Sequence, residues 1–154
     1  MGLNYWLMKS EPDTFSIDDL KKSPKQVTAW EGVRNFQARN FLRDQFQVGD
    51  LAFFYHSSCK VPAIVGIMEV IRTGLPDLTA CDPKSPYYDP KSSMAAPRWY
   101  LVELKLKEKF NTPITLSALK MNPKLSKMRL LQRGNRLSIL PVSQTEWRTI
   151  LNML

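Results

Sequence analysis

The chain has 154 residues, of which 44% are hydrophobic and 23% charged, so its composition excludes a disordered polypeptide and fits one domain over residues 1–154. No apolar run approaches the roughly 20 residues that cross a bilayer, and the start lacks the regions of a secretory signal. We therefore expect a monomeric, cytoplasmic chain with no membrane partner. With 2 Cys and 1 His, the sequence falls short of a disulfide framework or a four-ligand zinc site, so we expect no metal and no cofactor.

The first third of the chain predicts one strand and two helices. Residues 4–10 (NYWLMKS) are aromatic and apolar and end before Glu-Pro-Asp, which is typical of a strand. Ser16, with Asp19 three residues later, predicts the capping box of a short helix. Asn35 is a good helix cap, and an apolar stripe follows it at helical spacing, which predicts a helix over about residues 35–45.

The middle of the chain predicts three strands and one long loop. Residues 51–58 and 62–74 are bulky or β-branched, and Gly66 inside the second run indicates a bend or bulge. Residues 82–97 contain four prolines and predict a long loop, of the kind that in a compact domain is either functional or disordered. Residues 98–110 then alternate apolar and charged side chains, which indicates a strand with one face buried.

The last third predicts short helical pieces over 116–121 and 124–132 and a short strand at 137–140. Ser143 with Glu146 forms a second capping-box pattern, which starts the final helix. Strands therefore dominate the middle, and helices occur early and late. This pattern predicts an α+β fold: a small, mostly antiparallel β-barrel with helices packed around it.

The net charge is +8, and its distribution indicates a partner. No Asp or Glu occurs between Glu108 and Glu146, whereas basic residues continue throughout this stretch. A field of one sign attracts polyanions, of which nucleic acid is the usual intracellular one; a solvated face balanced by the acidic N-terminal third is the alternative. The residues that we expect to contact a nucleic-acid backbone are Arg39, Lys124, Lys127, Arg129, Arg133 and Arg136.

Six separated motifs, in this order, resemble those of the EVE-domain family. They are YWLMKSEPDTFS, WEGVRNFQARNFLR, GDLAFFYHSS, AIVGIMEV, DPKSPYYDPKS with PRWYLVEL, and RLSILPVSQTEW, and they extend from about Tyr5 to Trp147. The resemblance implies a PUA-like fold related to the YTH domains that read methylated bases. It also implies a module that binds modified bases in DNA or RNA, with a methylated or hydroxymethylated base flipped into an aromatic pocket.

Trp30 is the main candidate for the wall of such a pocket. A flipped base has a flat π-face and a hydrogen-bonding edge, so a reader needs an aromatic wall and fixed polar groups. Trp30 resembles a cage tryptophan of the YTH readers, and the following glycine allows the backbone to approach a ligand closely. Arg34 and Asn35 can donate to a base edge or a phosphate. The alternative is a core tryptophan that caps the barrel end.

The other pocket candidates lie mainly at the ends of predicted strands, where side chains reach a barrel mouth. An ion pair with Glu11 or a solvated strand end is the alternative role for Lys9, and a core position is the alternative for Tyr55. Tyr87 and Tyr88 of the long loop would either stack on neighbouring nucleotides or pack the loop down. The full expected base pocket is Lys9, Ser10, Trp30, Val33, Arg34, Asn35, Tyr55, His56, Ser57, Pro97, Trp99, Leu137 and Ser138.

Two other functions compete with a base reader. Some PUA-like relatives of the ASCH type resemble amidohydrolases acting on a modified nucleoside, and Lys9 and Glu11 would be the nearest equivalents of their lysine and glutamate. His56 and Cys59 are close in sequence, but closeness in sequence is not the geometry of a base and a nucleophile, so we predict no catalytic residue. A protein-interaction module using the basic face would need neither Trp30 nor a cavity.

Overall fold

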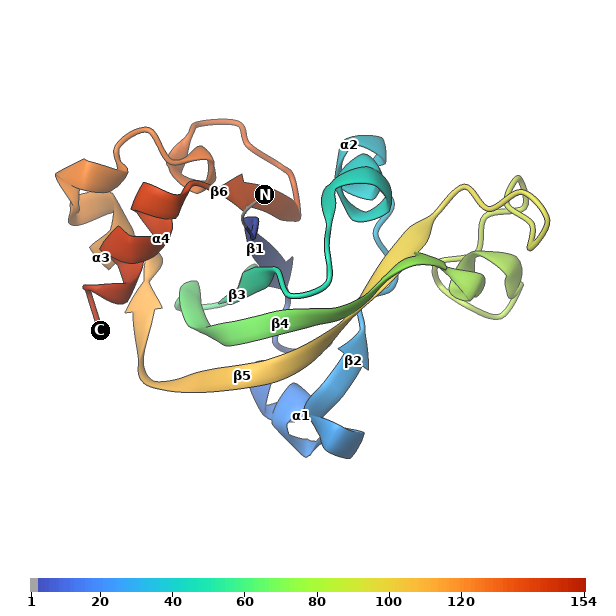
Figure 1. The fold of residues 1–154 in the computed structure, drawn as a ribbon, viewed down its shortest axis with the longest axis horizontal. Coiled ribbons are helices and arrows are strands. Elements are labelled where there is room, and N and C mark those ends of the chain that lie inside the picture. Colours follow the sequence, from blue (N-terminus) through green and yellow to red (C-terminus); the bar gives the residue numbers. More distant parts are fainter. Residues whose placement is uncertain (1–2) are drawn as a thin grey trace.

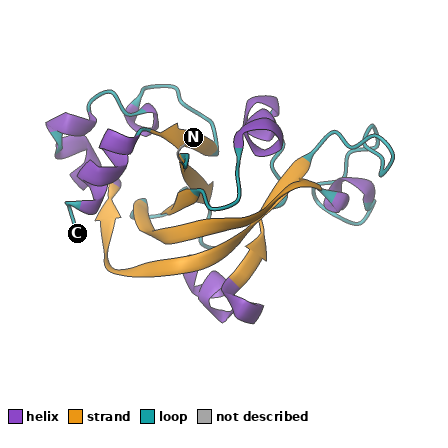
Figure 2. Cartoon of the chain, viewed as in Figure 1, coloured by secondary structure: helices purple, strands orange, loops and turns teal. Residues whose placement is uncertain are grey.

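The computed structural model describes residues 3–154, which form a six-stranded sheet with four α-helices packed around it (Figures 1 and 2). The strands are β1 (Tyr5–Ser10), β2 (Val27–Ala29), β3 (Leu51–His56), β4 (Ala63–Pro76), β5 (Tyr100–Thr115) and β6 (Ile139–Val142). The helices are α1 (Ile17–Lys22), α2 (Phe36–Asn40), α3 (Leu116–Met121) and α4 (Gln144–Leu151). A π-helical turn, Phe41–Gln45, continues α2. None of the described helices has both the length and the apolar content needed to cross a membrane.

The strand order is β2-β5-β4-β3-β1-β6, and every neighbouring pair is antiparallel except β1 with β3. The expected α+β class with a mostly antiparallel sheet is therefore confirmed. The sheet curls along the long strands β4 and β5, but β2 and β6 remain as its two edges, so the barrel is not closed (Figure 1). Both edges are short, and β6 contains Pro141, which lacks the N–H that a further strand would need.

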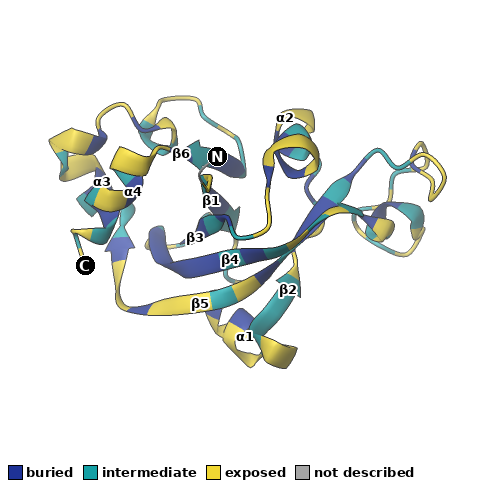
Figure 3. Cartoon of the chain, viewed as in Figure 1, coloured by how far each residue is buried: buried dark blue, intermediate teal, exposed yellow. Residues whose placement is uncertain are grey.

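Two hydrophobic clusters cover the two faces of the sheet, because successive side chains of a strand point to opposite faces. On β3, Phe54 belongs to the first cluster, whereas its neighbours Phe53 and Tyr55 belong to the second. The first cluster also contains Trp30, and the second contains Trp147 of α4. Figure 3 shows the buried colour along most of β4, in the middle of the sheet.

Most local sequence signals have the expected structural counterparts. Ser16 and Ser143 each form a complete capping box, at the starts of α1 and α4. Asn35 caps α2, because its side chain accepts a hydrogen bond from the Ala38 N–H at 3.0 Å. Gly66 lies at a register shift between β4 and β5, where an added Cβ would be 2.4 Å from the Glu108 carbonyl oxygen.

Other boundaries differ from those expected. Strand β2 was not predicted, since three residues are too few for a periodic pattern. Residues 124–132 form no continuous helix, only the 3₁₀ turns Pro123–Leu125 and Arg129–Leu131. The last strand is Ile139–Val142, two residues later than expected, because the edge position tolerates its proline.

Candidate functional site

A cavity of about 620 Å³ opens at the end of β1 and beside the segment that follows β2. One part of its wall comes from the last residues of β1 and the turn after them, and another from residues 28–35. Tyr87 and Ser138 approach from two distant parts of the chain. The lining residues are Lys9, Ser10, Glu11, Thr14, Phe15, Thr28, Ala29, Trp30, Glu31, Gly32, Val33, Arg34, Asn35, Tyr87 and Ser138.

The segment after β2 takes its course from a few backbone constraints. The Trp30 N–H donates to the Val102 carbonyl at 2.9 Å, which continues the pairing of β2 with β5 by one residue. Gly32 follows with φ +83°, a conformation that disfavours side chains. A Cβ on Gly32 would also lie 2.6 Å from the Tyr87 ring. Glycine therefore permits both the turn and the close packing of the 82–97 loop against the cavity wall.

Trp30 is both a core residue and a wall of the cavity. It is 8% exposed and packs edge-on against Phe54, with ring centroids 5.5 Å apart. Within residues 3–154 its indole N–H donates to no acceptor, whereas the indoles of Trp6 and Trp99 donate to Asp50 and Asp89. The two alternatives for Trp30, core or pocket, are thus not exclusive: one part of the ring supports the sheet and another borders the cavity.

Lys9 brings a half-buried cation to the cavity. Burial lowers the pKa of its ammonium group, and no carboxylate within residues 3–154 forms an ion pair with it. The alternative of a Lys9–Glu11 ion pair is therefore wrong, although both residues line the cavity. The pKa of the Glu31 carboxyl is raised, mainly by burial and further by the nearby charge of Asp77.

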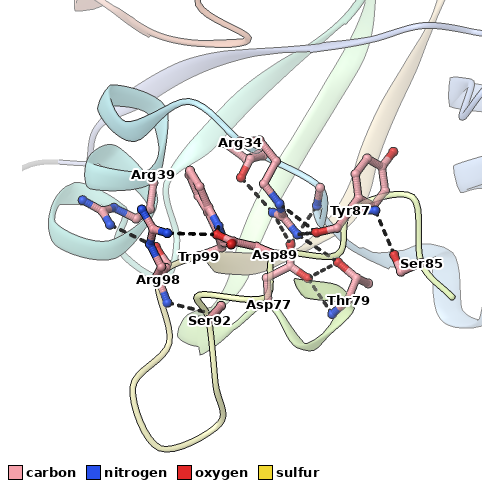
Figure 4. A network of polar contacts seen from close by, with 12 residues as sticks. Arg34, Arg39, Asp77, Thr79, Ser85, Tyr87, Asp89, Ser92, Arg98 and Trp99 are labelled. Atoms are coloured by element: carbon pink, nitrogen blue, oxygen red, sulfur yellow. Dashed lines mark hydrogen bonds and ion pairs between the residues drawn. The ribbon is translucent and has the colours of Figure 1, made fainter. Parts of the chain in front are cut away.

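All five guanidinium N–H groups of Arg34 donate to acceptors within the protein (Figure 4). Its Nε and one Nη2 N–H donate to the Tyr87 carbonyl at 3.1 and 2.8 Å, and Nη2 also donates to Thr79 Oγ1 at 3.3 Å. Nη1 donates to the Val33 carbonyl at 2.9 Å and to Asp77 Oδ2 at 3.0 Å. A guanidinium has five N–H groups, so none is left for a base edge. The expectation that Arg34 reads a base or phosphate is corrected: it ties the loop to the cavity wall.

Asp77 is the acceptor at the centre of this network. Its carboxylate is fully buried and accepts hydrogen bonds from the Gly32 N–H at 2.8 Å, the Thr79 N–H at 3.0 Å and the Thr79 hydroxyl at 2.5 Å, besides the Arg34 ion pair. Burial alone would raise the pKa of Asp77. The hydrogen bonds from Thr79, Gly32 and Arg34 outweigh that effect and hold the pKa below its ordinary value.

Seven of the thirteen expected pocket residues line the cavity. These are Lys9, Ser10, Trp30, Val33, Arg34, Asn35 and Ser138. Six do not line it: Tyr55, His56, Ser57, Pro97, Trp99 and Leu137.

The reasons for these absences are packing and hydrogen bonding. Tyr55 lies in the second cluster on the opposite face of the sheet, where burial raises the pKa of its hydroxyl to about 12. His56 accepts a hydrogen bond from the Ile17 N–H at 3.1 Å, and burial lowers the pKa of its imidazole. Trp99 stacks on Phe36 and donates to Asp89 at 2.7 Å. Leu137 packs against both hydrophobic clusters.

The residues expected on a nucleic-acid backbone come from two separate parts of the chain. Arg39 lies on α2, directly after the cavity segment. Residues 116–131, which carry Lys124, Lys127 and Arg129, lie at the opposite end of the longest axis from the 77–99 segment (Figure 1). That part of the chain buries Leu125 in the second cluster, so its basic side chains are the exposed side of a packed layer.

Sequence reasoning missed several lining residues, among them Thr14, Phe15, Thr28 and Glu31. Thr14, Phe15 and Glu31 lie within the quoted motifs but carry no separate signal for a pocket, and Thr28 lies outside those motifs. The turn after β1 offered an indirect signal, because the Glu-Pro-Asp sequence interrupts the strand and turns the chain back across its own end. The Ser10 hydroxyl donates to the Phe15 carbonyl at 2.6 Å and closes that turn.

The network around Asp77 yields a stability prediction. Asp77→Asn replaces one carboxylate oxygen, which accepts hydrogen bonds, by an NH₂ group that would face N–H or O–H donors. The free energy of unfolding should therefore fall by about 1–3 kcal/mol at neutral pH. The pKa of Asp77 is lowered by folding, so its contribution is present above the unfolded pKa and lost as pH falls through the folded pKa. The difference in the free energy of unfolding between the native protein and Asp77→Asn, measured by urea unfolding, should therefore become smaller in acid.

The matched control is Asp44→Asn, at an exposed carboxylate paired with its neighbour Arg43. That change should alter the free energy of unfolding much less than Asp77→Asn does, because solvent screens an exposed ion pair. Equal effects of the two variants would contradict a special role for Asp77.

Comparison with known proteins identifies relatives along almost the whole chain. The EVE domain family matches residues 4–153. Human thymocyte nuclear protein 1 is 41% identical over 167 residues, which cover 97% of this chain and 73% of that protein. A hypothetical protein from Leishmania major superposes with a TM-score of 0.92 at 44% identity, over 99% of this chain and 94% of that one.

A crystal structure of human THYN1 in complex with 5-methylcytosine-containing DNA superposes with a TM-score of 0.90 at 41% identity, over 97% of this chain and 96% of that one. An ASCH protein from Zymomonas mobilis, 11% identical, superposes with a TM-score of 0.55, a likeness of fold alone. The PUA-like α+β fold implied by the sequence motifs is thus confirmed. The chain belongs to the EVE domain family.

Proposed function

We propose that this protein is a nucleic-acid-binding module that holds a modified base, of the methylated-cytosine class, in the cavity beside Trp30. The observation that carries the proposal is the position of the Trp30 indole, which borders a cavity of about 620 Å³ and has no acceptor for its N–H within residues 3–154. Such a wall suits a flat ligand that has a hydrogen-bonding edge. A base on an aromatic face gains about 1–3 kcal/mol from stacking.

Lys9 and Glu31 supply polar groups of opposite hydrogen-bonding character to the same cavity. An ammonium group donates, and a carboxylate accepts. The edge of cytosine presents acceptors beside an amino donor, so it could meet both groups. The role of Arg34 in this scheme is to fix the wall, since its donors are already occupied.

The similarity to human THYN1, which was crystallised in complex with 5-methylcytosine-containing DNA, supports DNA as the nucleic acid and methylated cytosine as the class of modified base. The rival function, an ASCH-type amidohydrolase, has less support. Lys9 and Glu11 line the same cavity but form no ion pair, and His56 is engaged by the Ile17 N–H. We therefore favour binding over catalysis.

Trp30→Leu tests the proposal. It removes the aromatic face and the indole N–H but keeps apolar contact with Phe54. Affinity for an oligonucleotide with one 5-methylcytosine should fall by roughly 1–3 kcal/mol, while affinity for the unmodified sequence changes little. Fluorescence anisotropy with both oligonucleotides measures the selectivity directly.

Phe54→Leu is the control, because Phe54 is buried against Trp30 but does not line the cavity. Both variants should lower the melting temperature, and only Trp30→Leu should abolish selectivity. Equal selectivity in the two variants would leave Trp30 as a core residue without a role in base recognition.

Lys9→Met separates stability from binding. Folding lowers the pKa of Lys9, so burying its charged form opposes folding at neutral pH, and methionine should raise the melting temperature. The same change removes a charged donor from the cavity and should weaken binding of the modified oligonucleotide by about 1.5–3 kcal/mol. Lys60→Met, at an exposed lysine outside the cavity, should do neither. A Lys9→Met variant that binds like the native protein would exclude Lys9 from base recognition.

A further inference from the structure

An unusual group of side chains lies directly after the cavity segment, on α2 and at the end of the 77–99 segment. Phe36 is 48% exposed, and its ring stacks on Trp99 with centroids 4.8 Å apart. The guanidinium carbons of Arg39 and Arg98 are 4.8 and 5.5 Å from the centre of the Phe36 ring. We call these residues, Phe36, Arg39, Arg98 and Trp99, the Phe36 platform.

The Phe36 platform is held in a fixed arrangement. Arg39 Nη1 donates to the Arg98 carbonyl at 3.0 Å, and its Nε and Nη2 donate to Asn40 Oδ1 at 3.0 and 2.9 Å. Arg98 faces Asp89 at 3.4 Å, and Asp89 also accepts the Trp99 indole N–H. Since a guanidinium has five N–H groups, about two of those of Arg39 have no acceptor within residues 3–154. They remain available to a ligand oxygen.

The cavity itself cannot attract a polyanion strongly. Its lining has two basic residues, Lys9 and Arg34, and two acidic ones, Glu11 and Glu31. Arg34 is further neutralised by Asp77. The phosphates of a strand whose base enters the cavity therefore need cations outside it, and the Phe36 platform begins one residue after the lining residue Asn35.

The platform is also connected to the cavity wall. The Arg34 guanidinium carbon lies 5.2 Å from the Trp99 ring on one side and 5.5 Å from the Tyr87 ring on the other. Figure 4 shows Arg34, Trp99, Arg39 and Arg98 arranged side by side. A strand that leaves the cavity past Asn35 thus meets the half-exposed Phe36 ring, which stacks on Trp99 and has guanidinium groups over it. Aromatic rings and guanidinium planes are the groups on which an unstacked base packs, and guanidinium groups also bind its phosphate.

We propose that the Phe36 platform binds the nucleotide next to the one in the cavity, with its base on Phe36 and its phosphate on Arg39 and Arg98. This inference rests on the proposed function for the choice of ligand. Because the platform lies outside the cavity, it contacts the strand whether or not the base in the cavity is modified.

The test uses fluorescence anisotropy with a single-stranded DNA oligonucleotide carrying one central 5-methylcytosine and with the same sequence carrying cytosine. Phe36→Leu keeps an apolar cover over Trp99 but removes the aromatic face. It should weaken binding of both oligonucleotides by about tenfold and leave their affinity ratio unchanged. Phe36→Tyr keeps the ring and should bind like the native protein.

The charge of the platform is tested by salt dependence. Arg39→Gln with Arg98→Gln should reduce the slope of log affinity against log salt by about 1.4 if both residues contact phosphates. Lys124→Gln with Lys127→Gln removes the same charge from the other end of the molecule and should change the slope less. Thermal melts of each variant identify any loss of folding.

The outcomes separate the two proposals. Unchanged affinity in Phe36→Leu, or equal slopes in the two double variants, would overturn the platform. A loss confined to the modified oligonucleotide would also overturn it, since Phe36 would then act through the cavity. If the native protein does not prefer 5-methylcytosine, the cavity proposal fails, and the platform is still judged on the unmodified oligonucleotide.

Discussion

The buried Asp77 carboxylate is the interaction on which the rest of the site depends. It joins the Gly32 backbone and the Arg34 guanidinium to a segment 43 to 45 positions later in the chain. Arg34 in turn binds the Tyr87 carbonyl, and the Tyr87 ring closes over Gly32. A buried ion pair of this kind stabilises the fold only while each of its donors and acceptors has a hydrogen-bond partner. One carboxylate thereby fixes the wall of the cavity.

The sequence predicted the parts of the fold that depend on local chemistry. The capping boxes at Ser16 and Ser143 need only residues three positions apart, and the Gly66 irregularity needs only one residue. Register is not local: Phe54 and Tyr55 are adjacent, yet they serve opposite faces of the sheet. Tyr55 was therefore expected in the pocket, because a strand end indicates where a side chain lies along the sheet and not which face it occupies.

The difference between local and long-range interactions also explains which site residues were predicted correctly. Trp30 was chosen because it resembles a cage tryptophan of the YTH readers and because a glycine follows it closely. The role of Arg34 was assigned wrongly because its partner Asp77 is remote in sequence and no motif connects them. The acid-free stretch was prominent in the sequence, but most of it covers the second hydrophobic cluster. The guanidinium groups of the Phe36 platform come instead from α2 and the end of a loop.

The central claim is that a base occupies the cavity against Trp30, and the indole N–H resonances measure this most directly. In a ¹⁵N–¹H spectrum the chain gives one indole signal for each of its 4 Trp residues, and Trp30→Leu assigns one of them. On titration with the 5-methylcytosine oligonucleotide, the Trp30 signal should shift with saturation. The Trp6 signal should stay fixed, because that indole donates to the buried Asp50. Saturated binding with an unmoved Trp30 signal would contradict the account.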